Sequence, residues 1–131
     1  MPKSRGLNHV AMSVPRGTLT DETVAALCDF YGDHLGWQLM EAYRQPDRLT
    51  LAVGGRTYLN LRERDDVMVC HGYEHFGVTM ASEEDIEQLW RDLREDDRAV
   101  DVGELDRSED GFRVFRFRYL LPLTVEVQYL P

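Results

Sequence analysis

The chain has 131 residues, 43% hydrophobic side chains and a formal net charge of −9 at pH 7. This length suits one domain with a substantial core. The acidic charge disfavours nucleic acid and anionic membranes as partners. No apolar run is long enough to cross a membrane, and the first residues lack the apolar segment of a signal peptide. We therefore expect a cytoplasmic protein with neither of those partners.

Hydrophobic patterning predicts the same order of elements twice, namely strand, helix and three more strands. In the first half, we expect strand 7–14, helix 20–35 and strands 37–43, 48–53 and 56–62. Residues 63–72 are polar and are predicted to be a linker. In the second half, we expect strand 74–80, helix 82–95, a short strand 100–102, a polar turn 106–111 and strands 112–119 and 124–130. The predicted fold class is α+β, with two βαβββ modules, about 7–63 and 73–130, in a single domain 1–131.

Helix signals support both helices. Thr18 or Thr20 can cap the first helix, and Gly36 can end it, while Ser82 opens a variant capping box for the second. The expected buried stripes are Val24, Leu27, Cys28, Tyr31 and Leu35 in the first helix, and Ile86, Leu89, Trp90 and Leu93 in the second.

The two halves also repeat in detail. The stretch 7–14 is echoed by 73–80, at an offset of 66 residues, and each copy has a histidine in third place, His9 and His75. Glu126, in the last strand, follows His75 by 51 residues. The same step from His9 reaches Asn60, which is therefore predicted to be the counterpart of Glu126.

Strand side chains alternate between two faces, so each of four strands has one apolar face and one polar or small face. The two amphipathic helices can cover the apolar faces. The polar faces would then line a cavity inside a curved mixed sheet, with the helices outside. The polar sets are His9, Ala11 and Ser13; Tyr58, Asn60 and Arg62; His75, Gly77 and Thr79; and Thr124, Glu126 and Gln128.

Two imidazoles and one carboxylate can bind divalent iron, manganese, nickel, cobalt or zinc and leave coordination positions open. His9, His75 and Glu126 are thus candidate metal ligands. The competing interpretation is that the histidines are structural and that Glu126 lies on the solvated face of a sheet. The candidates for substrate binding are Asn60, Tyr58, Arg62, Thr79 and Gln128, for which ordinary surface polarity is an equal explanation.

The segments NHVAMSV, FYGDHLGWQ, EHFGVTM and VEVQYL resemble the vicinal oxygen chelate superfamily, which includes glyoxalase I, extradiol dioxygenases and bleomycin-resistance proteins. The resemblance implies metal ligands at His9, His75 and Glu126, with Asn60 in the fourth position. Glyoxalase I usually has a catalytic glutamate there, and Asn60 cannot act as that base. The apolar stretch 119–123 also departs from the family, which often has a Pro-Asp-Gly-type turn before the last strand.

The resemblance implies a metal-dependent dioxygenase, lyase, isomerase or transferase that acts on an oxygen-bearing small molecule, with its catalytic residue unassigned. It also implies a homodimer, in which a site lies within one chain or is shared between two. The alternative is a metal-free protein that sequesters an aromatic ligand, with Trp37, Tyr43, Tyr58 and Phe115 as candidates for stacking. A scaffold without a ligand has no positive support in the sequence.

Overall fold

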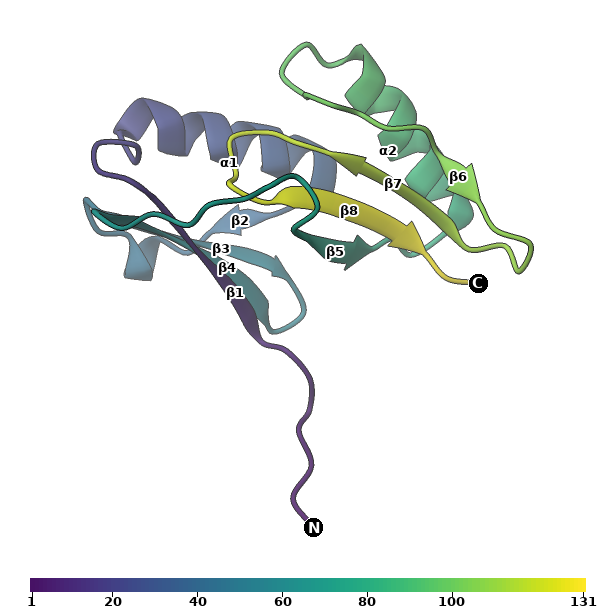
Figure 1. Ribbon diagram of the computed structural model, residues 1–131, viewed down its shortest axis with the longest axis horizontal. Helices are drawn as coiled ribbons and strands as arrows, with labels where there is room; N and C mark the ends of the chain where they lie inside the picture. The colour runs from purple at the N-terminus through teal and green to yellow at the C-terminus, as the bar shows by residue number, and fades with distance from the viewer. The chain divides into compact units, whose positions relative to one another are not determined.

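A computed structural model describes all residues, 1–131, and the chain divides into two compact units, residues 1–68 (unit 1) and 69–131 (unit 2). Each unit contains one helix and a four-stranded mixed sheet in the order βαβββ, as Figure 1 shows. The α+β class and the two predicted modules are therefore confirmed.

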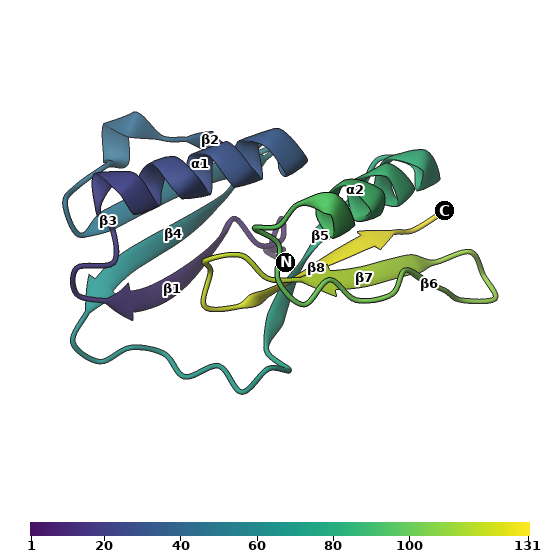
Figure 2. The ribbon, with the colours of Figure 1, turned by 90° about the horizontal axis from the view of Figure 1, so that it is seen from above.

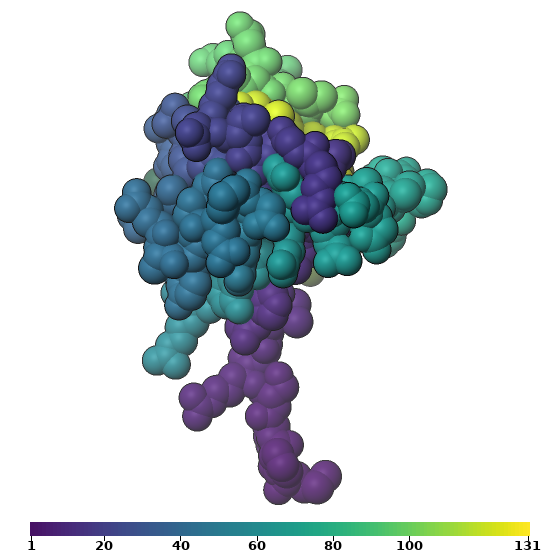
Figure 3. All heavy atoms as spheres, turned by 90° about the vertical axis from the view of Figure 1, so that its left-hand side faces the viewer, coloured from purple at the N-terminus to yellow at the C-terminus, as the bar shows by residue number.

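Unit 1 consists of β1 (His9–Pro15), α1 (Asp21–Leu35), β2 (Gln38–Leu39), the 3-10 helix η1 (Glu41–Tyr43), β3 (Arg48–Gly54) and β4 (Thr57–Arg64). Its sheet has the order β1-β4-β3-β2, with β1 parallel to β4 and the other pairs antiparallel. Figure 2 shows α1 lying along one face of this sheet. The residues before β1 are exposed and extend away from the unit, as the purple segment of Figure 3 shows.

Unit 2 consists of β5 (His75–Thr79), α2 (Glu83–Glu95), β6 (Asp106–Arg107), β7 (Arg113–Phe117) and β8 (Thr124–Tyr129). Its sheet has the order β5-β8-β7-β6, and β5 pairs in parallel with β8. The helix α2 lies along one face of β7 and β8 (Figure 2). The first strand of each unit thus pairs with its last strand.

The predicted helix ends are confirmed. The Thr20 hydroxyl accepts a hydrogen bond from the Thr23 amide, and the Ser82 hydroxyl accepts one from the Asp85 amide. Gly36 ends α1 at φ 71°, a left-handed conformation that glycine adopts without steric cost. Neither helix, at 15 and 13 residues, has the length and apolar composition needed to cross a membrane.

The helix-facing sides of the sheets form the core. In unit 1, the buried side chains alternate along the strands, as the period of two predicts. Phe30 is fully buried in α1, although the predicted stripe omitted it, whereas the predicted Cys28 is only half-buried. The buried residues of the three longer strands in unit 1 are Met12, Val14, Leu49, Leu51, Leu59 and Leu61, and those facing α2 in unit 2 are Phe115, Phe117, Val125 and Val127.

Two predicted strands are wrong in extent. The predicted strand 37–43 is paired only at Gln38–Leu39, because the chain then coils into η1, where the Tyr43 amide donates to the Met40 carbonyl. The predicted strand 100–102 is a single bridge between Val100 and Arg118, since Asp101 has a φ of 53° that interrupts an extended strand. The edge strand instead forms at 106–107, inside the predicted turn.

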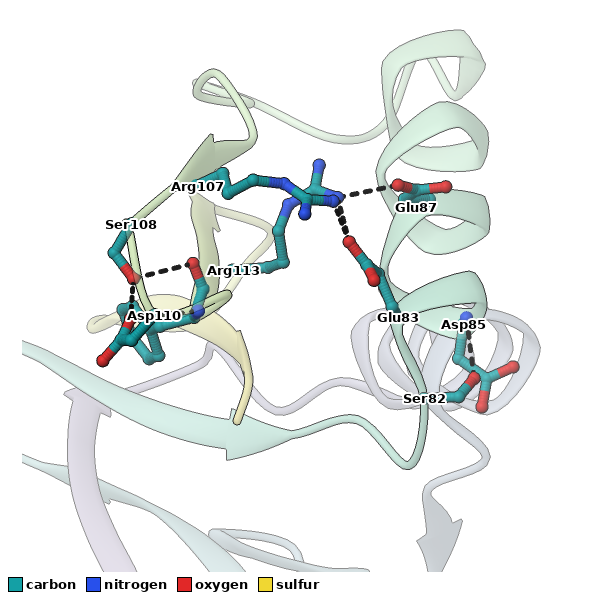
Figure 4. A network of polar contacts seen from close by, with 9 residues as sticks. Ser82, Glu83, Asp85, Glu87, Arg107, Ser108, Asp110 and Arg113 are labelled. Carbon is teal, nitrogen blue, oxygen red and sulfur yellow. Dashed lines mark hydrogen bonds and ion pairs between the residues drawn. The ribbon is translucent and has the colours of Figure 1, made fainter. Parts of the chain in front are cut away.

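A polar network joins α2 to the edge of its sheet, as Figure 4 shows. The Arg113 guanidinium is almost buried and donates to Glu83 at 3.0 Å and to Glu87 at 2.7 Å. Arg107 donates to the same Glu83 carboxylate from the exposed side. The helix–sheet contact of unit 2 therefore includes a shielded cation, which the hydrophobic pattern did not predict.

Candidate functional site

In unit 2, a histidine and a glutamate on neighbouring strands face each other. His75 is the first residue of β5, and Glu126 lies in the middle of β8. The His75 Nε2 atom lies 3.3 Å from Glu126 Oε2. Glu126 is only 7% exposed, so the interpretation that it lies on a solvated face is wrong.

The tautomer of His75 follows from its other ring nitrogen. Its Nδ1 atom lies 2.7 Å from the Tyr73 carbonyl oxygen, which can only accept a hydrogen bond. The Nδ1 atom therefore carries the proton, and in the neutral ring Nε2 has a lone pair aimed at a carboxylate oxygen. Two acceptors that face each other need a cation or a proton between them. A ring held by Nδ1 with Nε2 free is the arrangement of metal-binding histidines.

Glu126 also receives hydrogen bonds from two other side chains. Arg116 Nε donates to Glu126 Oε2 at 2.7 Å, and the Gln128 amide donates to Oε1. Burial raises the pKa of the Glu126 carboxyl, but the bonds from Gln128 and Arg116, with the Arg116 charge, outweigh it. The pKa of Glu126 is therefore held below its ordinary value, and the group is a carboxylate at neutral pH.

In unit 1, the second predicted histidine has the same ring arrangement. The His9 Nδ1 atom donates to Asn8 Oδ1 at 2.6 Å, which leaves Nε2 without a partner on the chain. The imidazole stacks on the Tyr58 ring, with centroids 4.9 Å apart and planes 5° apart. Tyr58 is the residue opposite His9 in the parallel pair of β1 and β4. This stacking fixes the plane of the imidazole while leaving Nε2 available.

The strand registers confirm that Asn60 is the counterpart of Glu126. Asn60 lies opposite Ala11 in unit 1, and Glu126 lies opposite Gly77 in unit 2, at the predicted offset of 66 residues. The residues at Ala11 and Gly77 are small, and in unit 2 the Gln128 side chain lies over Gly77.

The repeat extends to residues that the sequence analysis did not single out. Thr50 lies opposite Asn60 and donates to Asn60 Oδ1 at 2.7 Å, while Arg116 lies opposite Glu126 and donates to its carboxylate. Thr50 and Arg116 are themselves 66 residues apart. Applying the offset and the two-residue period to strand 112–119 would have found Arg116.

Each unit has a hollow on its polar face. The unit 1 hollow, of about 180 Å³, is lined by Met40, Tyr43, Arg48, Thr50, Tyr58 and Asn60. The unit 2 hollow, of about 330 Å³, has a lining that includes Glu104, Val114, Arg116 and Glu126. Three positions of the unit 1 lining, Arg48, Thr50 and Asn60, thus have their 66-residue counterparts in the unit 2 lining.

The other predicted substrate residues lie on the same polar faces. Thr79 is exposed opposite Gln128 in unit 2, and Arg62 is exposed opposite Ser13 in unit 1. Two aromatic residues proposed to stack on a ligand do not lie there. Trp37 is 5% exposed and stacks on Tyr31, and Phe115 is 2% exposed on the helix side of its sheet, so that proposal is wrong for both.

Two side chains of unit 2 are suitable ligands for a divalent metal. His75 and Glu126 supply one imidazole nitrogen and one carboxylate within unit 2, and these are accepted ligands for iron, manganese, cobalt, nickel and zinc. No cluster of three or more histidine, cysteine, aspartate or glutamate side chains suited to a metal is present. Arg116 adds a positive charge beside Glu126, yet the carboxylate has lone pairs for further partners.

A protein-family model described as "Glyoxalase/Bleomycin resistance protein/Dioxygenase superfamily" matches residues 6–118, most of the chain. The chain belongs to this superfamily. Among solved structures, it resembles lactoylglutathione lyase from Agrobacterium tumefaciens at 17% identity, with a TM-score of 0.68 and coverage of 97% of this chain and 95% of that one.

Two further structures show the same superfamily fold. A possible glyoxalase from Bacillus cereus is 19% identical, with a TM-score of 0.69 and coverage of 95% and 98%. An integron cassette protein from the mobile metagenome of the Halifax Harbour sewage outfall is 21% identical, with a TM-score of 0.66 and coverage of 97% and 100%. No curated protein sequence matches the chain. At these identities, the structural matches establish the fold alone.

Proposed function

We propose that the chain is a metal-dependent enzyme of the glyoxalase or dioxygenase type. His9, His75 and Glu126 would together hold one divalent ion, which would polarise an oxygen-bearing small molecule and hold it at open coordination positions. The observation that carries this proposal is the position of His75 Nε2, which lies 3.3 Å from an oxygen of the buried Glu126 carboxylate while Nδ1 is held by the Tyr73 carbonyl.

Neighbouring residues of the chain orient the three proposed ligands. Tyr73 holds His75 through the Nδ1 proton, and Asn8 and Tyr58 hold His9, so both rings are oriented before a ligand arrives. Arg116 and Gln128 keep Glu126 ionised and fix the direction of its carboxylate. Asn60 occupies the fourth position as an amide, which can donate or accept a hydrogen bond but cannot remove a proton from a substrate.

Three ligands drawn from both units require one site formed by His9 with His75 and Glu126. Such a site can be completed within one chain or between two chains of a homodimer. The ligand set is therefore tested by a mixture of variants. Equal amounts of His9→Ala and Glu126→Ala protein, unfolded and refolded together, would regain metal in about a quarter of the sites only if ligands come from different chains, because half of the dimers are mixed and one of their two sites is intact.

The direct test is the metal content of protein purified without a metal-binding tag, measured by mass spectrometry. We expect nearly one iron, manganese, nickel, cobalt or zinc per site, and at least a tenfold loss of affinity in His9→Ala, His75→Ala and Glu126→Ala. His71→Ala is the matched control, because His71 is an exposed histidine in the segment before β5. Protein that stays folded but takes up none of these ions would overturn the proposal.

That negative outcome would favour the second candidate, a metal-free protein that sequesters an aromatic small molecule. The observation for it is the unit 1 hollow, which has the rings of Tyr43 and Tyr58 in its lining. In that case a proton on His75 Nε2 would satisfy Glu126. Ligand binding that survives Glu126→Ala and is lost in Tyr58→Ala would support this candidate.

A further inference from the structure

The polar face of unit 1 carries two arginines that oppose each other without a partner. Arg48 in β3 and Arg62 in β4 are directly opposite in the antiparallel ladder. No hydrogen bond or ion pair holds either guanidinium within the chain. Like charges at directly opposed positions destabilise a sheet. The pair therefore has a cost that the folded chain does not itself offset.

A shortage of carboxylates does not explain this pair, because the chain has 24 Asp and Glu against 15 Lys and Arg. The acidic residues that follow Arg62 have other partners. Asp65 pairs with Arg16, and Asp66 pairs with Arg64. Glu63 lies on the other side of the strand and accepts a hydrogen bond from the Leu19 amide at 2.8 Å. The two guanidinium groups are thus left available to a negative charge from outside the chain.

The surroundings of Arg48 suit an organic anion. Arg48 is half-buried in the lining of the unit 1 hollow, together with the Tyr43 and Tyr58 rings, and the polar pair Thr50 and Asn60 lies next along the sheet. A guanidinium offers a planar fork of donors that matches carboxylate and phosphate oxygens. The aromatic rings offer an apolar surface for the remainder of such a molecule.

We propose that Arg48 and Arg62 form an anion subsite for an organic acid, either a carboxylate or a phosphate ester, whose apolar part contacts Tyr43 and Tyr58. This inference rests on the proposed function and adds the substrate class. Tyr58 and Arg62 are four positions apart along β4, which puts their Cα atoms roughly 13 Å apart at the rise of a strand. Because Arg48 and Tyr58 line the same hollow, an aromatic anion held by the Arg48 guanidinium can contact the Tyr58 ring.

The test is a titration followed by NMR of the arginine side chains and of the tyrosine rings, with a chelator present throughout. The probes are benzoate, phenyl phosphate and the neutral benzamide. We expect benzoate or phenyl phosphate to shift the Arg48, Arg62 and Tyr58 signals, and benzamide to bind at least about tenfold more weakly. Whichever of the two anions binds more tightly identifies the charged group. Binding of benzamide equal to that of both anions, or no binding of either anion, would overturn the proposal.

Single substitutions then test which arginines bind the anion. Arg48→Gln and Arg62→Gln should each weaken binding of the preferred anion by about tenfold or more. Arg56→Gln is the matched control, since Arg56 is an exposed, unpaired arginine in the turn between β3 and β4. Equal weakening in Arg56→Gln would mean that only the net charge matters, and unchanged binding in both Arg48→Gln and Arg62→Gln would contradict the subsite.

The stability of the same variants gives an independent reading. Because the two arginines repel each other, Arg48→Gln and Arg62→Gln should melt at the same temperature as the parent protein or higher. A lower melting temperature in both would show that the arginines stabilise the fold, which contradicts a subsite maintained for a ligand. The chelator keeps this test separate from the metal proposal: anion binding can fail while metal binding holds, and the reverse.

Discussion

The two units share one backbone plan but differ in the chemistry of their polar faces. In unit 1, the central cross-strand pair is Thr50 with Asn60, two neutral groups joined by one hydrogen bond. In unit 2, the equivalent pair is Arg116 with Glu126, an ion pair at 2.7 Å. The repeat fixes where side chains lie, and the residue at each position decides what the face can bind. Unit 2 thus presents a carboxylate, and unit 1 leaves two cations unpaired.

The largest expected effects lie where the units agree, in the apolar faces under the helices. Phe30→Ala in α1 and Ile86→Ala in α2 each empty a fully buried position, and each should lower the free energy of unfolding by about 3 to 4 kcal/mol. Urea denaturation measures this, with Asp29→Ala on the exposed side of α1 as the control. A loss below about 1 kcal/mol for either would mean that the core is loosely packed.

The next largest effect distinguishes the neutral pair in unit 1 from the ion pair in unit 2. Arg116→Met leaves the buried Glu126 carboxylate without its cation, and should cost about 2 kcal/mol in metal-free protein. Thr50→Val removes one neutral hydrogen bond, and should cost about 1 kcal/mol. The double variant Arg116→Met with Glu126→Gln should recover part of the loss. Equal losses in the two single variants would contradict the distinction between the units.

The helix side of unit 2 offers a smaller test, because α2 is joined to β7 by charge as well as by apolar contact (Figure 4). Arg113→Met keeps the volume but removes the contacts with Glu83 and Glu87, which are partly exposed and can be solvated. We expect a loss of about 1 kcal/mol that becomes smaller in high salt. Arg107→Met, at the exposed end of the same network, should be nearly neutral.

The smallest effect is the pH dependence that Glu63 gives to unit 1. Backbone hydrogen bonds from Leu19 and Gly17 hold the pKa of Glu63 below its ordinary value. Because the folded pKa is lower than the unfolded one, this stabilisation is present above about pH 4.3 and is lost as the pH falls through the lowered pKa. The difference in melting temperature between the parent protein and Glu63→Gln should therefore shrink in acid. Glu109→Gln, in an exposed turn of unit 2, is the control variant.

The sequence predicted well what depends on local pattern. Residue spacing along the sequence is enough to predict the helix caps at Thr20 and Ser82. It is also enough to predict the repeat that relates Asn60 to Glu126. Arg116 was missed because an arginine in a strand looks like ordinary surface charge until its partner across the ladder is known. Phe30 was missed because the predicted stripe was narrower than the buried face of α1.

The edge strands were harder to predict for a related reason. Whether residues 106–107 or 100–102 pair with β7 depends on a ladder partner and on the left-handed conformation of Asp101, and neither is visible in hydrophobicity. The ligand set itself stays a prediction, because His9 belongs to one unit while His75 and Glu126 belong to the other.

The parallel pairing of each unit's first strand with its last has a consequence for folding during synthesis. When His9 leaves the ribosome, its partner strand β4 has not yet been made, and nearly all of unit 1 must follow before the ladder can close. The same delay recurs between β5 and β8. Closing such long loops costs chain entropy before any contact is gained, so the two parallel ladders should close after the local antiparallel pairs β3–β4 and β7–β8. The histidines would therefore gain their fixed orientation among the last events of folding.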